Sequence, residues 1–127
     1  MSLVFFIDRS LGKNVVAAAL RAAGATVEVH DDHFVQDALD QVWLSDVGRR
    51  GWVVLTKDER IRYRSAETTA AANAGVALFI FVGKGVRGEG IAEAFVKALP
   101  AMHSLLTRSS RPFVAKVSRT GTVTMVN

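Results

Sequence analysis

Three aspartates stand where their carboxylates could act together on one ligand. Asp8 follows an apolar run at residues 3–7, Asp58 comes shortly after a second apolar run at residues 52–56, and Asp40 opens a segment with helical spacing. Carboxylates held close together repel one another unless a cation neutralises them, and Mg²⁺ prefers such oxygen ligands together with retained water. The alternative is that the three residues are helix caps and turn formers, which is a common role of aspartate.

The elements that must position these acids alternate between strands and helices. Apolar runs rich in β-branched and aromatic residues predict buried strands at residues 3–7, 26–30, 52–56 and 76–82. Helical spacing of apolar residues predicts helices at residues 11–23, 40–51, 60–74 and 91–106. Two final runs, at residues 113–117 and 122–126, flank a Ser-Arg-Thr-Gly turn signal and predict a β-hairpin. The sequence therefore predicts a three-layer α/β/α fold with a mainly parallel sheet and a C-terminal β-hairpin extension.

Three of the predicted helices have specific expected features. The inward face of the first is predicted to consist of Leu11, Val15, Ala18, Ala19 and Ala22. In the second, Asp40 is predicted to be the N-cap, and the inward face is predicted to consist of Val42, Trp43 and Val47. Pro100 is expected to kink or divide the last helix. Because ligands bind outside the carboxyl ends of parallel strands, the acids are expected to gather at that edge of the sheet.

Length and composition restrict the class of protein. The chain has 127 residues, of which half are apolar and 22% are charged, so it is expected to form a single domain over residues 1–127. The absence of cysteine excludes a disulfide scaffold, a thiolate zinc site and a cysteine nucleophile. The N-terminal residues lack the features of a secretory signal or a membrane span, so a cytoplasmic protein is expected. A net charge of +4 permits a polyanionic partner.

Three segments of the chain together resemble a known family. They are FFIDRSLG at residues 5–12, AAGATVEVHDDHF at residues 22–34 and DQVWLSDVGRRGWVVLTKDERIR at residues 40–62. This combination resembles the PIN-like nuclease domains, in particular the VapC-type toxins with Asp-x-x-Trp on a helix and Thr-Lys-Asp after a strand. Looser agreement continues through the fourth predicted strand, so the resemblance extends over most of the chain.

The resemblance implies a Mg²⁺- or Mn²⁺-dependent endoribonuclease that is the toxin of a toxin-antitoxin pair. Asp8, Asp40 and Asp58 match the metal-binding acids of the family, and Asp46 is a candidate for the further acid that such domains often contribute. Thr56 is expected to orient a carboxylate or a metal-bound water through its hydroxyl group. The implied partners are an RNA substrate and a cognate antitoxin protein, and a homodimer is also expected.

Basic residues near the acids are candidates for RNA binding. Arg9 and Lys57 each stand next to a predicted metal ligand, where they could contact the scissile phosphate or balance the acids. Arg60 and Arg62 belong to a basic segment that would attract the RNA backbone independently of its sequence. The alternative for these residues is an ordinary solvated face with exposed salt bridges.

Other patterns suggest different functions. Residues 83–88 satisfy G-x-G-x-x-G between a strand and a helix, but Arg108 stands where a dinucleotide site needs an acid, so a flexible turn is favoured. Residues 30–33, His-Asp-Asp-His, are interpreted as a strand end running into a polar loop, and Trp43 and Trp52 as core residues. A catalytically inactive PIN-like domain and a receiver-like binding domain stay open as alternatives, although a receiver needs paired acids where Arg9 follows Asp8.

Overall fold

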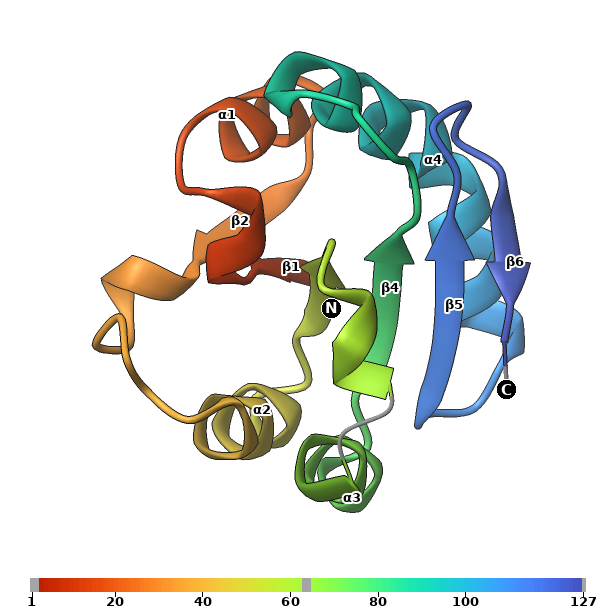
Figure 1. Ribbon diagram of the computed structural model, residues 1–127. Helices are drawn as coiled ribbons and strands as arrows, with labels where there is room; N and C mark the ends of the chain where they lie inside the picture. The colour runs from red at the N-terminus through yellow and green to blue at the C-terminus, as the bar shows by residue number, and fades with distance from the viewer. Residues whose placement is uncertain (1–2, 63–64, 127) are drawn as a thin grey trace.

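This computed structural model describes residues 3–62 and 65–126, except for the side chains of residues 62 and 65–68. A six-stranded sheet forms the centre of the described part of the chain (Figure 1). The strand order is β2-β1-β3-β4-β5-β6, and β6 is antiparallel to β5 whereas the other pairs are parallel. The strands are β1 (Val4–Ile7), β2 (Thr26–Val29), β3 (Val53–Thr56), β4 (Ala77–Phe81), β5 (Phe113–Val117) and β6 (Val123–Met125).

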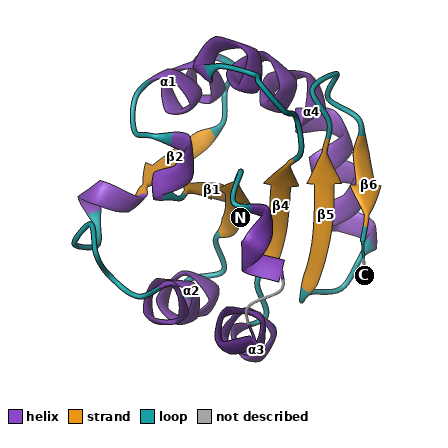
Figure 2. Cartoon of the chain, in the orientation of Figure 1, coloured by secondary structure: helices purple, strands orange, loops and turns teal. Residues whose placement is uncertain are grey.

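Helices cover both faces of this sheet, as Figure 2 shows. One face carries α1 (Val15–Ala22) and α4 (Gly88–Arg108), and the other carries α2 (Asp40–Arg49) and α3 (Ser65–Ala74). Short 3₁₀ turns follow three of the strands: η1 (Arg9–Leu11), η2 (His30–Asp32) and η3 (Glu59–Arg62). Within the described residues, none of the helices combines the length and the apolar character needed to cross a membrane. The predicted three-layer fold with its terminal hairpin is confirmed.

The central strands read as continuous apolar runs because both of their faces are buried. Along β1, Phe5 and Ile7 join the core beneath α1 and α4, while Phe6 joins the core beneath α2 and α3. The same alternation occurs in β3, where Leu55 faces the first core and Val54 the second. Successive side chains of a strand point to opposite faces, so each short strand contributes to two cores and is held firmly in register.

The predicted inward face of the first helix is confirmed only in part: Leu11 is buried and Ala19 packs against the core, whereas Val15, Ala18 and Ala22 are exposed. The segment begins as the 3₁₀ turn η1, which stops at Gly12 with φ of 72°, and α1 itself starts only at Val15. Val15 is 46% exposed, whereas Val16 and Leu20 are buried against the sheet. The break at Gly12 separates Leu11 from α1, so Leu11 does not set the phase of that helix. The alanine-rich sequence offers few large side chains that would reveal the true phase.

Two details predicted for the second helix also need correction. Leu39 is the N-cap, and Asp40 is the first helical residue, whose side chain bonds to other partners described below. Val42 is 54% exposed, because the buried stripe of α2 consists of Trp43, Leu44 and Val47. The inward positions predicted for Trp43 and Val47 are confirmed.

Pro100 does not divide the last helix. The helix α4 continues through Pro100 to Arg108, and it begins at Gly88, three residues earlier than the apolar spacing predicts. Pro100 lies at an exposed position of this helix, where its missing N–H group is not enclosed in the core.

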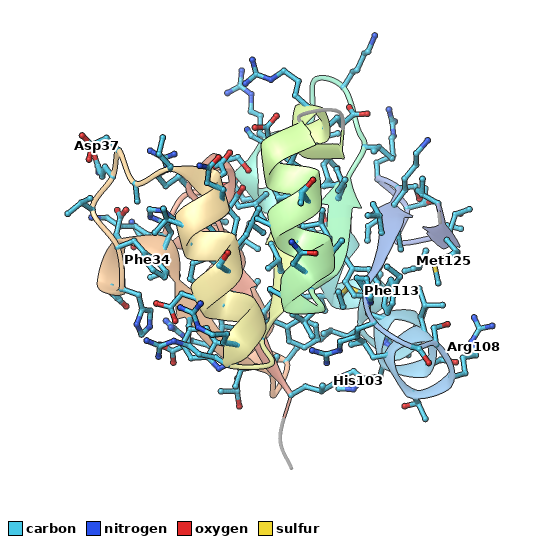
Figure 3. The ribbon with its side chains drawn as sticks, turned by 90° about the horizontal axis from the view of Figure 1, so that it is seen from below. Phe34, Asp37, His103, Arg108, Phe113 and Met125 are labelled. Atoms are coloured by element: carbon cyan, nitrogen blue, oxygen red, sulfur yellow. The ribbon has the colours of Figure 1, made fainter. Side chains whose placement is uncertain are left out.

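Close packing of α2 against α3 fixes the helix that begins with Asp40. Figure 3 shows these two helices side by side, viewed from below the orientation of Figure 1. A Cβ atom at Gly48 would lie 2.8 Å from the carbonyl oxygen of Ala74 and 2.9 Å from a methyl carbon of Val76. Only glycine permits this approach, because the position has no room for a side chain.

Candidate functional site

The carboxyl edge of the sheet between β1 and β3 is a topological switch point. β1 pairs with β2 on one side and with β3 on the other, so the chain leaves the carboxyl ends of β1 and β3 in opposite directions. Open α/β sheets bind their ligands in the crevice at such a point. Ile7 pairs with Leu55, which makes Asp8 and Thr56 neighbours at this edge, and the Asp8 amide donates to the Leu55 carbonyl oxygen over 3.2 Å.

Asp8 is a buried carboxylate with partners on both oxygens. The residue Asp8 is only 6% exposed. Oδ1 accepts hydrogen bonds from the backbone amide of Ser10, over 3.0 Å, and from the Ser10 hydroxyl group. Oδ2 accepts a hydrogen bond of 2.6 Å from the hydroxyl group of Thr56. Asp8 is therefore the N-cap of η1 and, at the same time, the most enclosed acid of the predicted site.

Burial raises the pKa of Asp8 to about 6. The hydrogen bonds from Ser10 and Thr56 stabilise the charged form and oppose this rise, whereas the nearby carboxylate of Asp40 adds to it. The Asp8 carboxylate is therefore ionised at neutral pH, although its charged form is destabilised by burial and by repulsion from Asp40. A bound cation would relieve both, and perturbed acids of this kind are concentrated at functional sites.

A network of hydroxyl groups fixes the ends of β1 and β3 to each other. Ser10 Oγ lies 3.1 Å from Thr56 Oγ1, and it accepts a hydrogen bond of 3.0 Å from the backbone amide of Lys57. Thr56 Oγ1 in turn accepts a hydrogen bond of 3.0 Å from the Asp58 amide. The structure places the Thr56 hydroxyl on the Asp8 carboxylate, where it can orient that group. The contribution of Ser10 was not predicted, although Asp-x-Ser after a strand is a typical signal of an aspartate-capped turn.

Asp40 approaches the site from the first turn of α2. Its Oδ1 accepts a hydrogen bond of 2.9 Å from the indole nitrogen of Trp43 and lies 3.7 Å from Nη2 of Arg9. The electrostatic effect of Asp40 on Asp8 places the two acids in one neighbourhood. Asp40 and Arg9 form a partly exposed pair close enough to Asp8 to act on its charge, whereas Asp8 itself is buried.

Asp58 has the capping geometry that the sequence leaves open as an alternative. Its Oδ1 accepts hydrogen bonds from the backbone amide of Arg60, over 3.1 Å, and from the Arg60 side chain, over 3.2 Å. The side chains of Lys57 and Arg60 are exposed on the same edge of the sheet, and the side chain of Arg62 lies outside the described residues. Asp58 therefore follows β3, as the sequence predicts, and its carboxylate accepts hydrogen bonds from Arg60 in the turn η3.

Asp46 lies on a different side of α2 from Asp40. Six helical residues separate them, which corresponds to roughly 9 Å along the axis and about 120° around it. Asp46 Oδ1 pairs with Nε of Arg50 over 2.8 Å, one turn further along the helix. The partner that the structure shows for Asp46 is therefore a basic residue of the same helix, on a different side from Asp40.

The donor set suits a hard cation that keeps most of its water. Among the side chains that the structure describes, which leave out residues 62–68, no three histidine or acidic groups form a ready-made metal cage. Asp8 and Asp40 provide two carboxylates, and the nearby hydroxyl groups of Ser10 and Thr56 provide polar support. Mg²⁺ is commonly bound by one or two carboxylates together with waters and substrate phosphate oxygens, so these residues fit such an ion.

Comparisons with known proteins show which family the chain resembles. Residues 3–83 match the family model described as "PIN like domain", a span that includes β1 to β4 and the switch-point acids. The chain is 28% identical over 116 residues to a Mycobacterium tuberculosis protein named "Putative ribonuclease VapC45", and the match covers 88% of this chain and 83% of the relative. No solved structure matches the chain at a significant level.

Proposed function

The chain belongs to the PIN-like domain family, and we propose that it is an endoribonuclease that hydrolyses RNA phosphodiester bonds with Mg²⁺ or Mn²⁺ as cofactor. One observation carries this proposal: a buried, desolvated carboxylate, Asp8, lies at the switch point of the sheet, within the field of a second carboxylate, Asp40. The relative named as a ribonuclease supports RNA as the substrate.

Asp8 and Asp40 would hold the cation between them. When bound, Mg²⁺ or Mn²⁺ lowers the pKa of a water molecule and stabilises negative charge on the phosphate under attack, so no protein nucleophile is needed. Thr56 and Ser10 orient Asp8 through their hydrogen bonds, which fix the carboxylate plane without contributing a charge. Asp58 is proposed as a third acid; its Oδ1 accepts a hydrogen bond from the Arg60 side chain in the structure, and cation binding would compete with this contact.

Cations around this edge would hold the RNA backbone. Arg9 is 41% exposed at its side chain and only 3.7 Å from Asp40, so its guanidinium can reach a phosphate next to the metal site. Lys57 and Arg60 are exposed on the adjoining turn. Such contacts attract RNA of any sequence and weaken steeply with salt.

We also propose that the protein is the toxin of a toxin-antitoxin pair. The relative carries a VapC name, which supports this proposal. The partner of such a toxin would be a cognate antitoxin protein that blocks the ribonuclease. Assembly as a homodimer belongs to the same proposal. A receiver-like function is disfavoured because β1 is followed by a single acid, Asp8, and then by Arg9. The remaining alternative is an inactive PIN-like domain, and the experiment below distinguishes it from the proposed ribonuclease.

The proposed activity is tested with purified protein and a pool of structured RNA at pH 7.5. We expect cleavage in the presence of Mg²⁺ or Mn²⁺, complete loss with EDTA, and recovery when the divalent ion is added in excess. Asp40→Asn should lose most of the activity, whereas Glu93→Gln, an exposed acid on α4, should cleave like the wild type. Cleavage that persists in EDTA and in Asp40→Asn would indicate a contaminant. Absence of cleavage by the wild type under all metal conditions would favour the inactive alternative.

A further inference from the structure

A pocket of about 390 Å³ opens beside the candidate site, between the loops that follow β1 and β2. Its volume falls within the range of pockets that bind small molecules. The lining residues come from η1 and the turn after it, from η2, and from the loop that leads to α2: Arg9, Gly12, Lys13, His30, Asp31 and Gln36. Arg9 joins the two sites, because it lines this pocket and also lies 3.7 Å from Asp40.

His30 is a buried side chain in the wall of this pocket. The residue is 2% exposed, and neither ring nitrogen has a hydrogen-bond partner within the part of the chain that the structure describes. Oδ1 of Asp31 lies 3.7 Å from Nδ1, which is too far for a hydrogen bond. Aromatic rings enclose His30, among them Phe34, which is labelled in Figure 3 on the loop beside α2. Buried polar atoms without a partner are rare, so a ligand in the pocket would give these nitrogens a role.

The charges around the pocket favour an anion over a metal ion. Arg9 and Lys13 bring two cations, against the single carboxylate of Asp31. Lys13 pairs with Asp31 only loosely, at 3.9 Å and with 61% of the lysine side chain exposed. Exposed pairs of this kind contribute little to stability, so both cations can turn toward a phosphate group at small cost.

The chemistry of His30 suits a neutral polar group beside that phosphate. Burial lowers the pKa of His30, and the positive charge of Arg9 lowers it further, so the ring is neutral at pH 7. A neutral imidazole has one donor and one acceptor nitrogen, which matches a sugar hydroxyl group or the edge of a base. The amide of Gln36, which also lines the pocket, can likewise donate and accept.

We propose that this pocket binds one nucleotide of the RNA strand, next to the phosphate that is cleaved. Arg9 and Lys13 contact the phosphate of that nucleotide, while His30 and Gln36 form hydrogen bonds to its sugar or base. His30 and Gln36 then select the nucleotide that precedes or follows the cleavage site. This inference rests on the proposed ribonuclease function, because it assigns a substrate contact of the same site.

Nucleoside 5′-monophosphates test the inference through NMR titration of the wild-type protein, with inorganic phosphate as the probe of anion binding alone. At least one of the four common monophosphates is expected to bind five times more tightly than inorganic phosphate. His30→Phe, which keeps an aromatic ring against Phe34, and Lys13→Ala should each weaken that binding at least fivefold. Gln36→Ala should also weaken it, and because Gln36 is exposed this variant does not depend on the folding of His30→Phe.

Matched controls come from α4, away from the pocket. His103→Gln and Lys97→Ala change an exposed histidine and an exposed lysine, and both variants should bind nucleotides like the wild type (Figure 3 labels His103). Equal binding of inorganic phosphate and all four monophosphates would overturn the inference, as would unchanged binding in both His30→Phe and Gln36→Ala.

The inference and the proposed function fail in different ways. If the wild type cleaves RNA with Mg²⁺ while the His30, Lys13 and Gln36 variants cut the same positions at the same rates, the pocket does not bind substrate and the proposed function stands. If the wild type cleaves no RNA but binds a nucleotide through His30, the proposed function fails, and of the inference only the nucleotide-binding pocket stands, without a cleavage site beside it.

Discussion

RNA cleavage is expected to fall at least about 100-fold when Asp8 is replaced by asparagine. Loss of a group that merely supports a metal ligand already costs 10- to 100-fold in affinity or activity, and Asp8→Asn removes a proposed ligand itself. The substitution preserves the shape of the side chain, so Ser10 and Thr56 keep a hydrogen-bonding neighbour. The rate of cleavage of a labelled RNA under single-turnover conditions measures the effect.

The stability of the same variant separates loss of chemistry from loss of fold. Asp8→Asn should be at least as stable as the wild type at pH 7.5 without metal, because it no longer buries an ionised carboxylate near Asp40. Cleavage by Asp8→Asn within threefold of the wild type would remove Asp8 from the reaction. Unfolded protein would instead indicate that its main role is capping η1.

The stability of the metal-free protein is expected to decrease as the pH rises from about 4 to 7, by about 2 kcal/mol through Asp8 alone. The pKa of Asp8 is about 6 in the folded protein and 3.8 as its ordinary value, so the folded state binds this proton more tightly between these limits. The stabilisation is therefore complete below pH 3.8 and is lost as the pH rises through 6.

His30 acts in the opposite direction and must be separated from this effect. Because burial lowers the pKa of His30, its contribution to stability is complete above pH 6.5 and decreases as the pH falls below that value. Urea unfolding of the wild type and of Asp8→Asn at pH 4, 5, 6 and 7 isolates Asp8, since His30 is common to both proteins. The stability of the variant relative to the wild type should grow by about 2 kcal/mol across this range. A difference that does not change with pH would mean that Asp8 is not desolvated.

Much of the fold could be predicted because the central strands are buried on both faces. Runs such as residues 3–7 and 76–82 do not alternate between apolar and polar residues. This feature distinguishes a parallel sheet that is covered on both faces from an antiparallel sheet with one face in water. The phase of α1 could not be predicted in the same way. Its alanines carry little information on direction, and adjacent Val15 and Val16 fit two different faces of a helix equally well.

The candidate site was predictable to the extent that chain topology places its residues. Asp8 and Thr56 end neighbouring parallel strands, so their contact follows once the strand order is known. The orientation of Asp58 was not predictable, because an aspartate after a strand has the same local sequence whether it caps a turn or binds a ligand. The burial of His30 depends on rings brought from distant segments, Phe6 and Trp43, and no local pattern reveals it.

Titration of the protein with Mn²⁺ by isothermal calorimetry at pH 7.5 tests the central claim most directly, namely that Asp8 and Asp40 hold a divalent cation at the end of β1. The wild type should show one saturable site, and Asp8→Asn and Asp40→Asn should each weaken binding at least about tenfold, with Glu93→Gln unchanged. If both aspartate variants bind Mn²⁺ as tightly as the wild type, the cation is bound elsewhere and the proposed site is wrong.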